Sequence, residues 1–91
     1  MQLSNLSLKN NIFLAPMAGI TTLPFRVLLR DFGCALAFTE MLSANGLARE
    51  SAKSRRYLKS SPMDRPLSVQ LFGSEPLILA EGARIVAGYG A

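Results

Sequence analysis

The sequence predicts an α/β fold with parallel strands, arranged as a partial (β/α)8 barrel. Three observations predict it: short apolar runs alternate with segments of helical spacing, Gly and Pro punctuate the boundaries, and no repeat or linker interrupts the chain. This alternation favours a parallel sheet with right-handed crossovers. Three strands cannot close a barrel that needs about eight. We therefore expect residues 1–91 to form one domain part, about the first three βα units behind a short N-terminal β flap, with the C-terminal remainder absent.

Composition narrows the class of protein. A hydrophobic content of 49% and a charged content of 18% argue for ordered packing rather than disorder. No run approaches the roughly 20 apolar residues of a membrane helix, and the N-terminus lacks the pattern of a secretory signal. We expect a cytoplasmic protein without membrane association. The net charge of +4 favours an acidic partner, with nucleic acid as the first candidate.

Cysteine and histidine usage limits the possible sites. The chain has one cysteine, Cys34, and no histidine, so it has no internal disulfide and no Cys/His metal set. We expect no metal site. Cys34 follows Gly33 at the start of an apolar run, which is typical of a small buried residue.

The first unit runs from the N-terminus to Arg30. Leu3, Leu6 and Leu8 stand among polar residues, which predicts a hairpin that plugs the bottom of the sheet. The run from 12 to 15 is apolar enough for an interior strand, and Pro16 should end its pairing. Gly19 has φ freedom and, with Ala18, keeps the following loop small, so that backbone amides could lie against a flat or anionic ligand.

The first helix should begin at Thr22 as N-cap, with Pro24 in its first turn. Four apolar residues recur at helical spacing and are expected to face inward: Phe25, Leu28, Leu29 and Phe32. Arg26 and Arg30 are then expected on the solvent side.

The second unit begins after Gly33, a natural residue to follow a helix C-terminus. Residues 35–39 predict a short strand, with Thr39, Glu40 and Met41 at its C-terminal end. Residues 43–60 predict one basic helix that ends at the Ser-Ser-Pro sequence. Glu40 can order a site, meet a nucleotide, or satisfy the amides of a neighbouring loop.

The third unit follows a turn at residues 63–66. Residues 67–72 alternate in polarity and predict a strand, which Gly73 ends. Ser74 can cap a third helix that continues to about Ala87, with a buried stripe of three residues, Leu79, Ala83 and Val86. In a parallel barrel the site lies at the C-terminal strand ends, so residues 16–18, 39–41 and Gln70 should converge there.

Three sequence motifs carry a family resemblance. LAPMAGITTLPFR, TEMLSANGL and VQLFGSEP occur in this order and span nearly the whole chain. Together they resemble the N-terminal part of the tRNA-dihydrouridine synthases, most closely the bacterial B-type branch. APM alone is less specific, because dihydroorotate dehydrogenases and old yellow enzymes share a similar strand ending. The family is built on a TIM barrel.

The resemblance implies a flavin site. Residues matching Pro16, Met17 and Ala18 lie along the FMN ring, and the residue matching Gln70 hydrogen-bonds the ring, because a carboxamide offers both donor and acceptor. The other interpretations are a strand-ending turn with a core methionine, and a polar plug inside the barrel.

The resemblance also implies a reaction. NADPH reduces FMN, the flavin passes hydride to uracil C6 in tRNA, and a cysteine protonates C5. That cysteine belongs to a motif beyond Ala91 and is not matched by Cys34, so no catalytic residue is assigned here. We expect the 91-residue chain to be inactive alone.

A basic run holds five of the ten Lys and Arg residues, opposed only by Glu50: Arg49, Lys53, Arg55, Arg56 and Lys59. It predicts either a solvated helix face or phosphate contacts with tRNA. Two further functions stay open, another FMN-dependent TIM-barrel oxidoreductase acting on a small molecule such as dihydroorotate, and a non-catalytic RNA-binding fragment. Unpaired strand edges favour self-association of the isolated chain.

Overall fold

A parallel sheet forms the centre of the computed structural model, which describes all residues from Met1 to Ala91. β3 (Phe13–Leu14), β4 (Leu36–Phe38) and β6 (Leu67–Ser68) form a three-stranded sheet in that order. Both pairings are parallel, with Leu14 opposite Ala37 and Ala37 opposite Leu67. The predicted α/β class with parallel strands is confirmed. β4 is the central strand and β3 is an edge strand, so Ile12 and Phe13 are exposed rather than interior.

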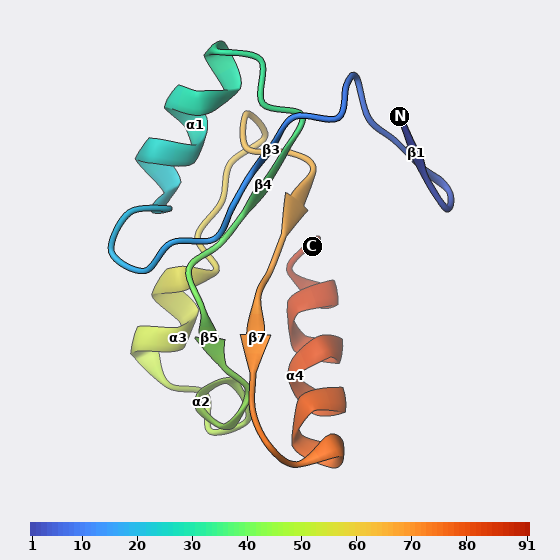
Figure 1. Ribbon diagram of the computed structural model, residues 1–91. Coiled ribbons are helices and arrows are strands. Elements are labelled where there is room, and N and C mark those ends of the chain that lie inside the picture. Colours follow the sequence, from blue (N-terminus) through green and yellow to red (C-terminus); the bar gives the residue numbers. More distant parts are fainter.

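A second parallel ladder continues the sheet. β5 (Leu42–Ser43) pairs with β7 (Leu71–Phe72), and Leu42 lies opposite Leu71. The predicted single strand from 67 to 72 is therefore two short segments, β6 and β7, each paired to a different partner. The segment from 39 to 41 is correspondingly a link between β4 and β5. Figure 1 shows β5 and β7 side by side in the middle of the molecule, with α3 on one side and α4 on the other.

Helix α1 (Leu23–Asp31) begins and ends as predicted, but only part of its predicted inward stripe, Phe25 and Leu29, is half-buried. Its N-cap is Thr22, a Pro lies in its first turn, and Gly33 follows its C-terminus with a φ of +99°. Arg26 is the buried residue of the helix, whereas Leu28 is 51% and Phe32 77% exposed. The expectation that Arg26 and Arg30 face solvent is wrong, because both guanidinium groups find a buried carboxylate partner, described below.

The predicted basic helix is two short helices, α2 (Ala44–Ala48) and α3 (Ala52–Tyr57). Glu50 adopts a φ of +57°, a left-handed conformation that ends helical pairing. Ser43 and Ser51 then cap the two helices by accepting hydrogen bonds from Gly46 N and Ser54 N. The predicted common face of Arg49, Lys53 and Arg56 is lost, since Arg49 lies before the break.

Helix α4 (Pro76–Gly88) packs against α2. Its N-cap is Glu75 rather than the predicted Ser74, and of the predicted stripe Val86 is buried while Ala83 is exposed. Gly82 is buried instead, because its missing side chain lets the helix approach Ala44; a Cβ at Gly82 would lie 3.3 Å from Ala44 Cβ. The main apolar cluster consists of Leu42, Leu47, Leu58 and Val86.

The N-terminal hairpin is present, with β1 (Gln2–Leu3) antiparallel to β2 (Leu6–Ser7). Leu8 is buried against Ala35 and Leu36. Leu3 and Leu6 line an apolar hollow of about 370 Å³ over the sheet and stay more than a third exposed, so the hairpin borders this hollow rather than plugging it. None of the helices is both long and apolar enough to cross a membrane.

Candidate functional site at the strand ends

The loop after β3 is a compact turn held by Met17 and Thr21. Met17 O accepts hydrogen bonds from Ile20 N (3.1 Å) and Thr21 N (2.9 Å), and the Thr21 hydroxyl lies 3.1 Å from both Met17 N and Met17 O. Gly19 has a φ of +73°, which confirms the predicted need for its conformational freedom. The Met17 side chain is 36% exposed, so it is free to contact a ligand.

The carboxylate of Glu40 holds this loop to the end of β4. It is 9% exposed and accepts a hydrogen bond of 2.5 Å from Gly19 N. Of the roles considered for Glu40, satisfying a neighbouring loop amide is the one observed. The expectation that the loop amides are available to a ligand needs correction, because Glu40 and internal contacts engage most of them. Ala18 N, which has no protein acceptor, is the exception.

Thr39 joins β4 to the third strand end. Its fully buried hydroxyl donates to Glu40 O (2.8 Å) and accepts from Gln70 N (3.3 Å). Gln70 O in turn accepts from Leu42 N at 2.9 Å. Hydrogen bonds thus connect all three predicted strand ends, from Gly19 through Glu40 and Thr39 to Gln70. The Gln70 carboxamide is partly exposed and makes no hydrogen bond to protein.

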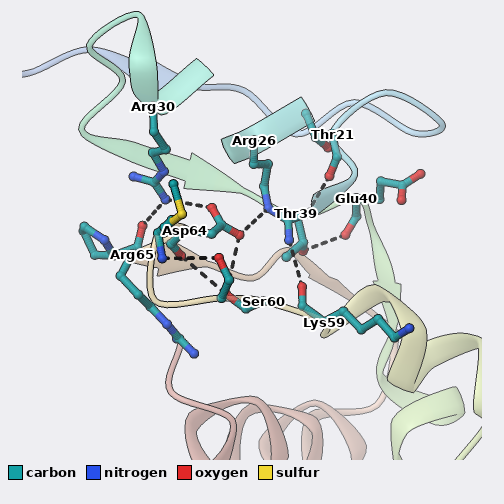
Figure 2. A network of polar contacts seen from close by, with 12 residues as sticks. Thr21, Arg26, Arg30, Thr39, Glu40, Lys59, Ser60, Asp64 and Arg65 are labelled. Atoms are coloured by element: carbon teal, nitrogen blue, oxygen red, sulfur yellow. Dashed lines mark hydrogen bonds and ion pairs between the residues drawn. The ribbon is translucent and has the colours of Figure 1, made fainter. Parts of the chain in front are cut away.

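A buried polar cluster under α1 was not predicted. Asp64, in the turn at residues 63–66, is fully buried and accepts from Arg26 Nε at 2.8 Å and Arg30 Nη2 at 3.1 Å. Figure 2 shows both arginines reaching from α1 toward this carboxylate. Two cations share one buried anion here, and the remaining donors therefore need other acceptors.

Backbone carbonyls supply most of those acceptors. Arg26 also donates to Thr21 O (2.6 Å) and Lys59 O (3.0 Å), so it connects the loop after β3 to the end of α3 (Figure 2). Arg30 donates to Ala35 O (3.0 Å) and Pro66 O (2.6 Å), and only its Nε lacks an acceptor. The one sequence signal was the i, i+4 spacing of two arginines on a helix, with a single Asp in a short turn downstream.

The five basic residues do not form one surface. Lys53, Arg56 and Lys59 line a cavity of about 320 Å³ beside Glu40 and the start of α1. Arg55 lines a different cavity, donates to Glu50 O at 2.8 Å, and lies 4.0 Å from the Glu50 carboxylate. Arg49 is the exposed C-cap of α2 and lines neither cavity.

Whether a flavin fits at the strand ends depends on the side-chain bulk of the loop after β3 and on the polar groups left without a protein partner. The loop is low in bulk at Ala18 and Gly19, and a Cβ built at Gly19 would meet nothing within 4 Å. The loop carries an exposed thioether at Met17 and a free Ala18 amide, and hydrogen bonds through Glu40 and Thr39 connect it to the backbone of Gln70, whose carboxamide makes no hydrogen bond to protein. These groups suit the face and the polar edge of a planar heterocycle. No cluster of three or more His, Cys, Asp or Glu residues is arranged to hold a metal ion.

Comparison with known proteins gives consistent matches. A family model described as dihydrouridine synthase matches residues 13–91. The tRNA-dihydrouridine synthase B of Vibrio cholerae serotype O1 is 40% identical over 91 residues, all of this chain and 28% of that protein. Its Salmonella typhimurium counterpart is 42% identical over 93 residues, with the same coverage. A probable tRNA-dihydrouridine synthase of Rhizobium leguminosarum is 43% identical over 86 residues, 94% of this chain and 27% of that protein. The chain therefore spans little more than a quarter of these relatives.

Proposed function

The chain belongs to the dihydrouridine synthase family, and on that premise we propose that it forms the N-terminal part of an FMN-binding TIM barrel that reduces uridine to dihydrouridine in tRNA, with NADPH as electron donor. One observation supports the proposed flavin site. The loop at Pro16–Ala18, the Thr39–Glu40 link and Gln70 are joined by hydrogen bonds at the C-terminal side of parallel strands. Barrel enzymes of this kind place their chemistry on that side of the sheet.

Each of these residues has a defined part in holding the flavin. Met17 would offer a polarizable contact to the ring face, and Pro16 and Ala18 would lie along the ring. Gln70 offers a donor and an acceptor to the polar edge of the ring. Glu40 and Thr39 are positioning residues, because they act through Gly19 N and Gln70 N. When bound, FMN supplies the hydride.

The protein supplies no proton donor in this part of the barrel. Cys34 is 4% exposed, its Sγ lies 3.1 Å from Leu36 O, and it precedes β4 at the N-terminal side of the sheet. It is therefore on the wrong side to protonate a base lying over Met17. This supports the expectation that the 91 residues do not turn over alone.

The partial barrel is part of the same proposal. β3 and β6 are the two edges of the three-stranded sheet, and each has one unpaired side. Three residues that border the apolar hollow, Phe13, Leu36 and Phe38, share one face of the sheet, and we infer that this face would point into a closed barrel. Further strands would pair with both edges and cover this hollow, whereas the isolated chain is expected to self-associate through them.

A chimera tests the function directly. This chain would replace the aligned N-terminal segment of the Vibrio cholerae relative, with which it shares 40% identity. We expect a yellow protein with flavin absorbance that forms dihydrouridine in unmodified tRNA when given NADPH. A folded chimera that stays colourless after reconstitution with FMN would contradict the proposal. Reduction of dihydroorotate-type substrates instead of tRNA would favour a small-molecule oxidoreductase.

A further inference from the structure

The cavity between α3 and the start of α1 has the features of an anion site. Its volume is about 320 Å³, and three cations line it, Lys53, Arg56 and Lys59. Lys53 and Arg56 lie on α3, and Lys59 follows its C-terminus. The buried guanidinium of Arg26 and the Thr22 N-cap complete the wall on the α1 side. Two separate segments therefore line this open cavity, and its three cationic residues are exposed to solvent.

The charges around this cavity are not neutralised by the protein. No carboxylate lies within 4.0 Å of Lys53, Arg56 or Lys59, whereas Arg26 is paired with Asp64. Glu40 is the one acidic residue in the wall, and its carboxylate is already bonded to Gly19 N. Three cations thus face a single, engaged anion, which leaves a site that favours a negatively charged ligand.

The start of α1 strengthens the same preference. Thr22 makes no side-chain cap hydrogen bond, and the first turn of this nine-residue helix holds no acidic residue. The positive end of the helix dipole therefore faces the cavity without a compensating side chain.

We propose that this cavity binds a backbone phosphate of the RNA substrate, next to the nucleotide presented to the loop at Pro16–Ala18. The inference rests on the proposed function for the identity of the RNA. Position supports it, because Glu40 lines the cavity and also holds Gly19 of that loop. Apart from Leu23, Pro24 and Tyr57, the residues that line the cavity are polar or charged. The cavity therefore suits a phosphate group better than the flat apolar face of a base.

The proposal also separates the five basic residues into two groups, those that line the cavity and those that do not. Lys53, Arg56 and Lys59 make the site, whereas Arg55 and Arg49 lie outside it. A diffuse basic surface would use all five residues alike, since its attraction depends only on total charge. At a defined phosphate site, by contrast, RNA binding would depend mainly on the three residues that line the cavity.

The test compares charge-matched double variants of the chimera described above by fluorescence anisotropy with an unmodified tRNA transcript. Lys53→Gln with Arg56→Gln removes two site cations, and Lys9→Gln with Arg84→Gln removes two exposed cations elsewhere. We expect the first pair to weaken RNA binding about tenfold near 0.1 M salt and, because one phosphate contact is lost, to reduce the salt slope by about 0.7 to 0.9. The control pair should stay within about threefold. Far-UV circular dichroism verifies that each variant keeps the parent fold.

Three results would overturn the proposal. These are equal losses from both pairs, an unchanged salt slope for the site pair, or no RNA binding by the folded parent chimera. Arg49→Gln with Arg55→Gln should cause a smaller loss than the site pair, and an equal loss would contradict the division.

Competition distinguishes RNA from other sources of phosphate. Inorganic phosphate should displace RNA only weakly, and NADPH should compete no better than NADH. Stronger competition by NADPH would assign the cavity to the 2′-phosphate of the dinucleotide and overturn the RNA assignment. Flavin binding is scored separately, so a chimera without FMN whose RNA binding still depends on Lys53 and Arg56 would reject the proposed function and leave this site standing.

Discussion

The two halves of the molecule fill the space beside the strands in different ways. Under α1 the filling is polar, with Asp64 held by Arg26 and Arg30. Near α4 it is apolar, with Leu42, Leu47, Leu58 and Val86 in contact. Apolar packing is non-directional, whereas each bond to Arg26 or Asp64 fixes a distance and an angle.

The polar half is the half that touches the candidate site. Arg26 holds Thr21 O of the loop after β3 and Lys59 O beside the cavity between α3 and the start of α1. The apolar cluster includes no residue of the loop after β3, and it meets the second segment only through Leu58, the chain neighbour of Lys59, and Tyr57. We infer that the polar cluster positions the loop, and that the apolar cluster contributes stability to the whole domain. The following variants test whether the two clusters have these separate roles.

Asp64→Ala should have the largest effect. It leaves two guanidinium groups buried without their carboxylate, and loss of one partner from a buried ion pair costs about 3 to 5 kcal/mol. Urea unfolding of Asp64→Ala, measured beside Asp31→Ala at an exposed carboxylate, checks this. A loss below about 1 kcal/mol for Asp64→Ala would show that the cluster contributes little to stability.

Leu42→Ala should destabilise by a similar or smaller amount without disturbing the loop. Leu42 is fully buried in the apolar cluster, and such truncations cost about 2 to 5 kcal/mol through lost transfer energy and a residual cavity. Hydrogen exchange at Gly19 and Thr21, measured under conditions where the variant is folded, should match the parent. Faster exchange at these amides would mean that the two halves are not separable.

Glu40→Gln should have a small effect on stability and a local effect on the loop. The neutral amide can still accept from Gly19 N but loses the charge assistance, which corresponds to about 1 kcal/mol. We expect faster exchange of the Gly19 amide while the apolar cluster stays protected. If the Gly19 amide exchanges as in the parent, the Glu40 contact does not hold the loop.

The sequence was sufficient for features set by local backbone chemistry. Pro24, Gly33 and Gly19 lie where ring constraint and φ freedom require them. The order of the three βα units was also predictable, because apolar runs and turn residues alternate plainly. The buried state of Cys34 followed from its neighbours.

The features that were missed depend on partners distant in sequence. Arg26 was predicted outside because hydrophobic periodicity assigns charge to solvent, and its partner Asp64 lies 38 residues away. The break between α2 and α3 requires a left-handed backbone conformation at Glu50, and no Gly or Pro at that position indicates it in the sequence. The contact of Thr39 with Gln70 arises only when two strands pair, so the sequence predicted the convergence of these residues but not the bonds between them.

The most direct test of the central claim is the FMN dissociation constant of the chimera with Gln70→Ala, beside Gln2→Ala in the exposed hairpin as control. If the strand ends meet around a flavin, loss of the Gln70 carboxamide should weaken FMN binding about three- to tenfold, equivalent to one hydrogen bond, and slow flavin reduction by NADPH. Gln2→Ala should change neither quantity. Unchanged FMN affinity and reduction rate in Gln70→Ala would contradict the claim.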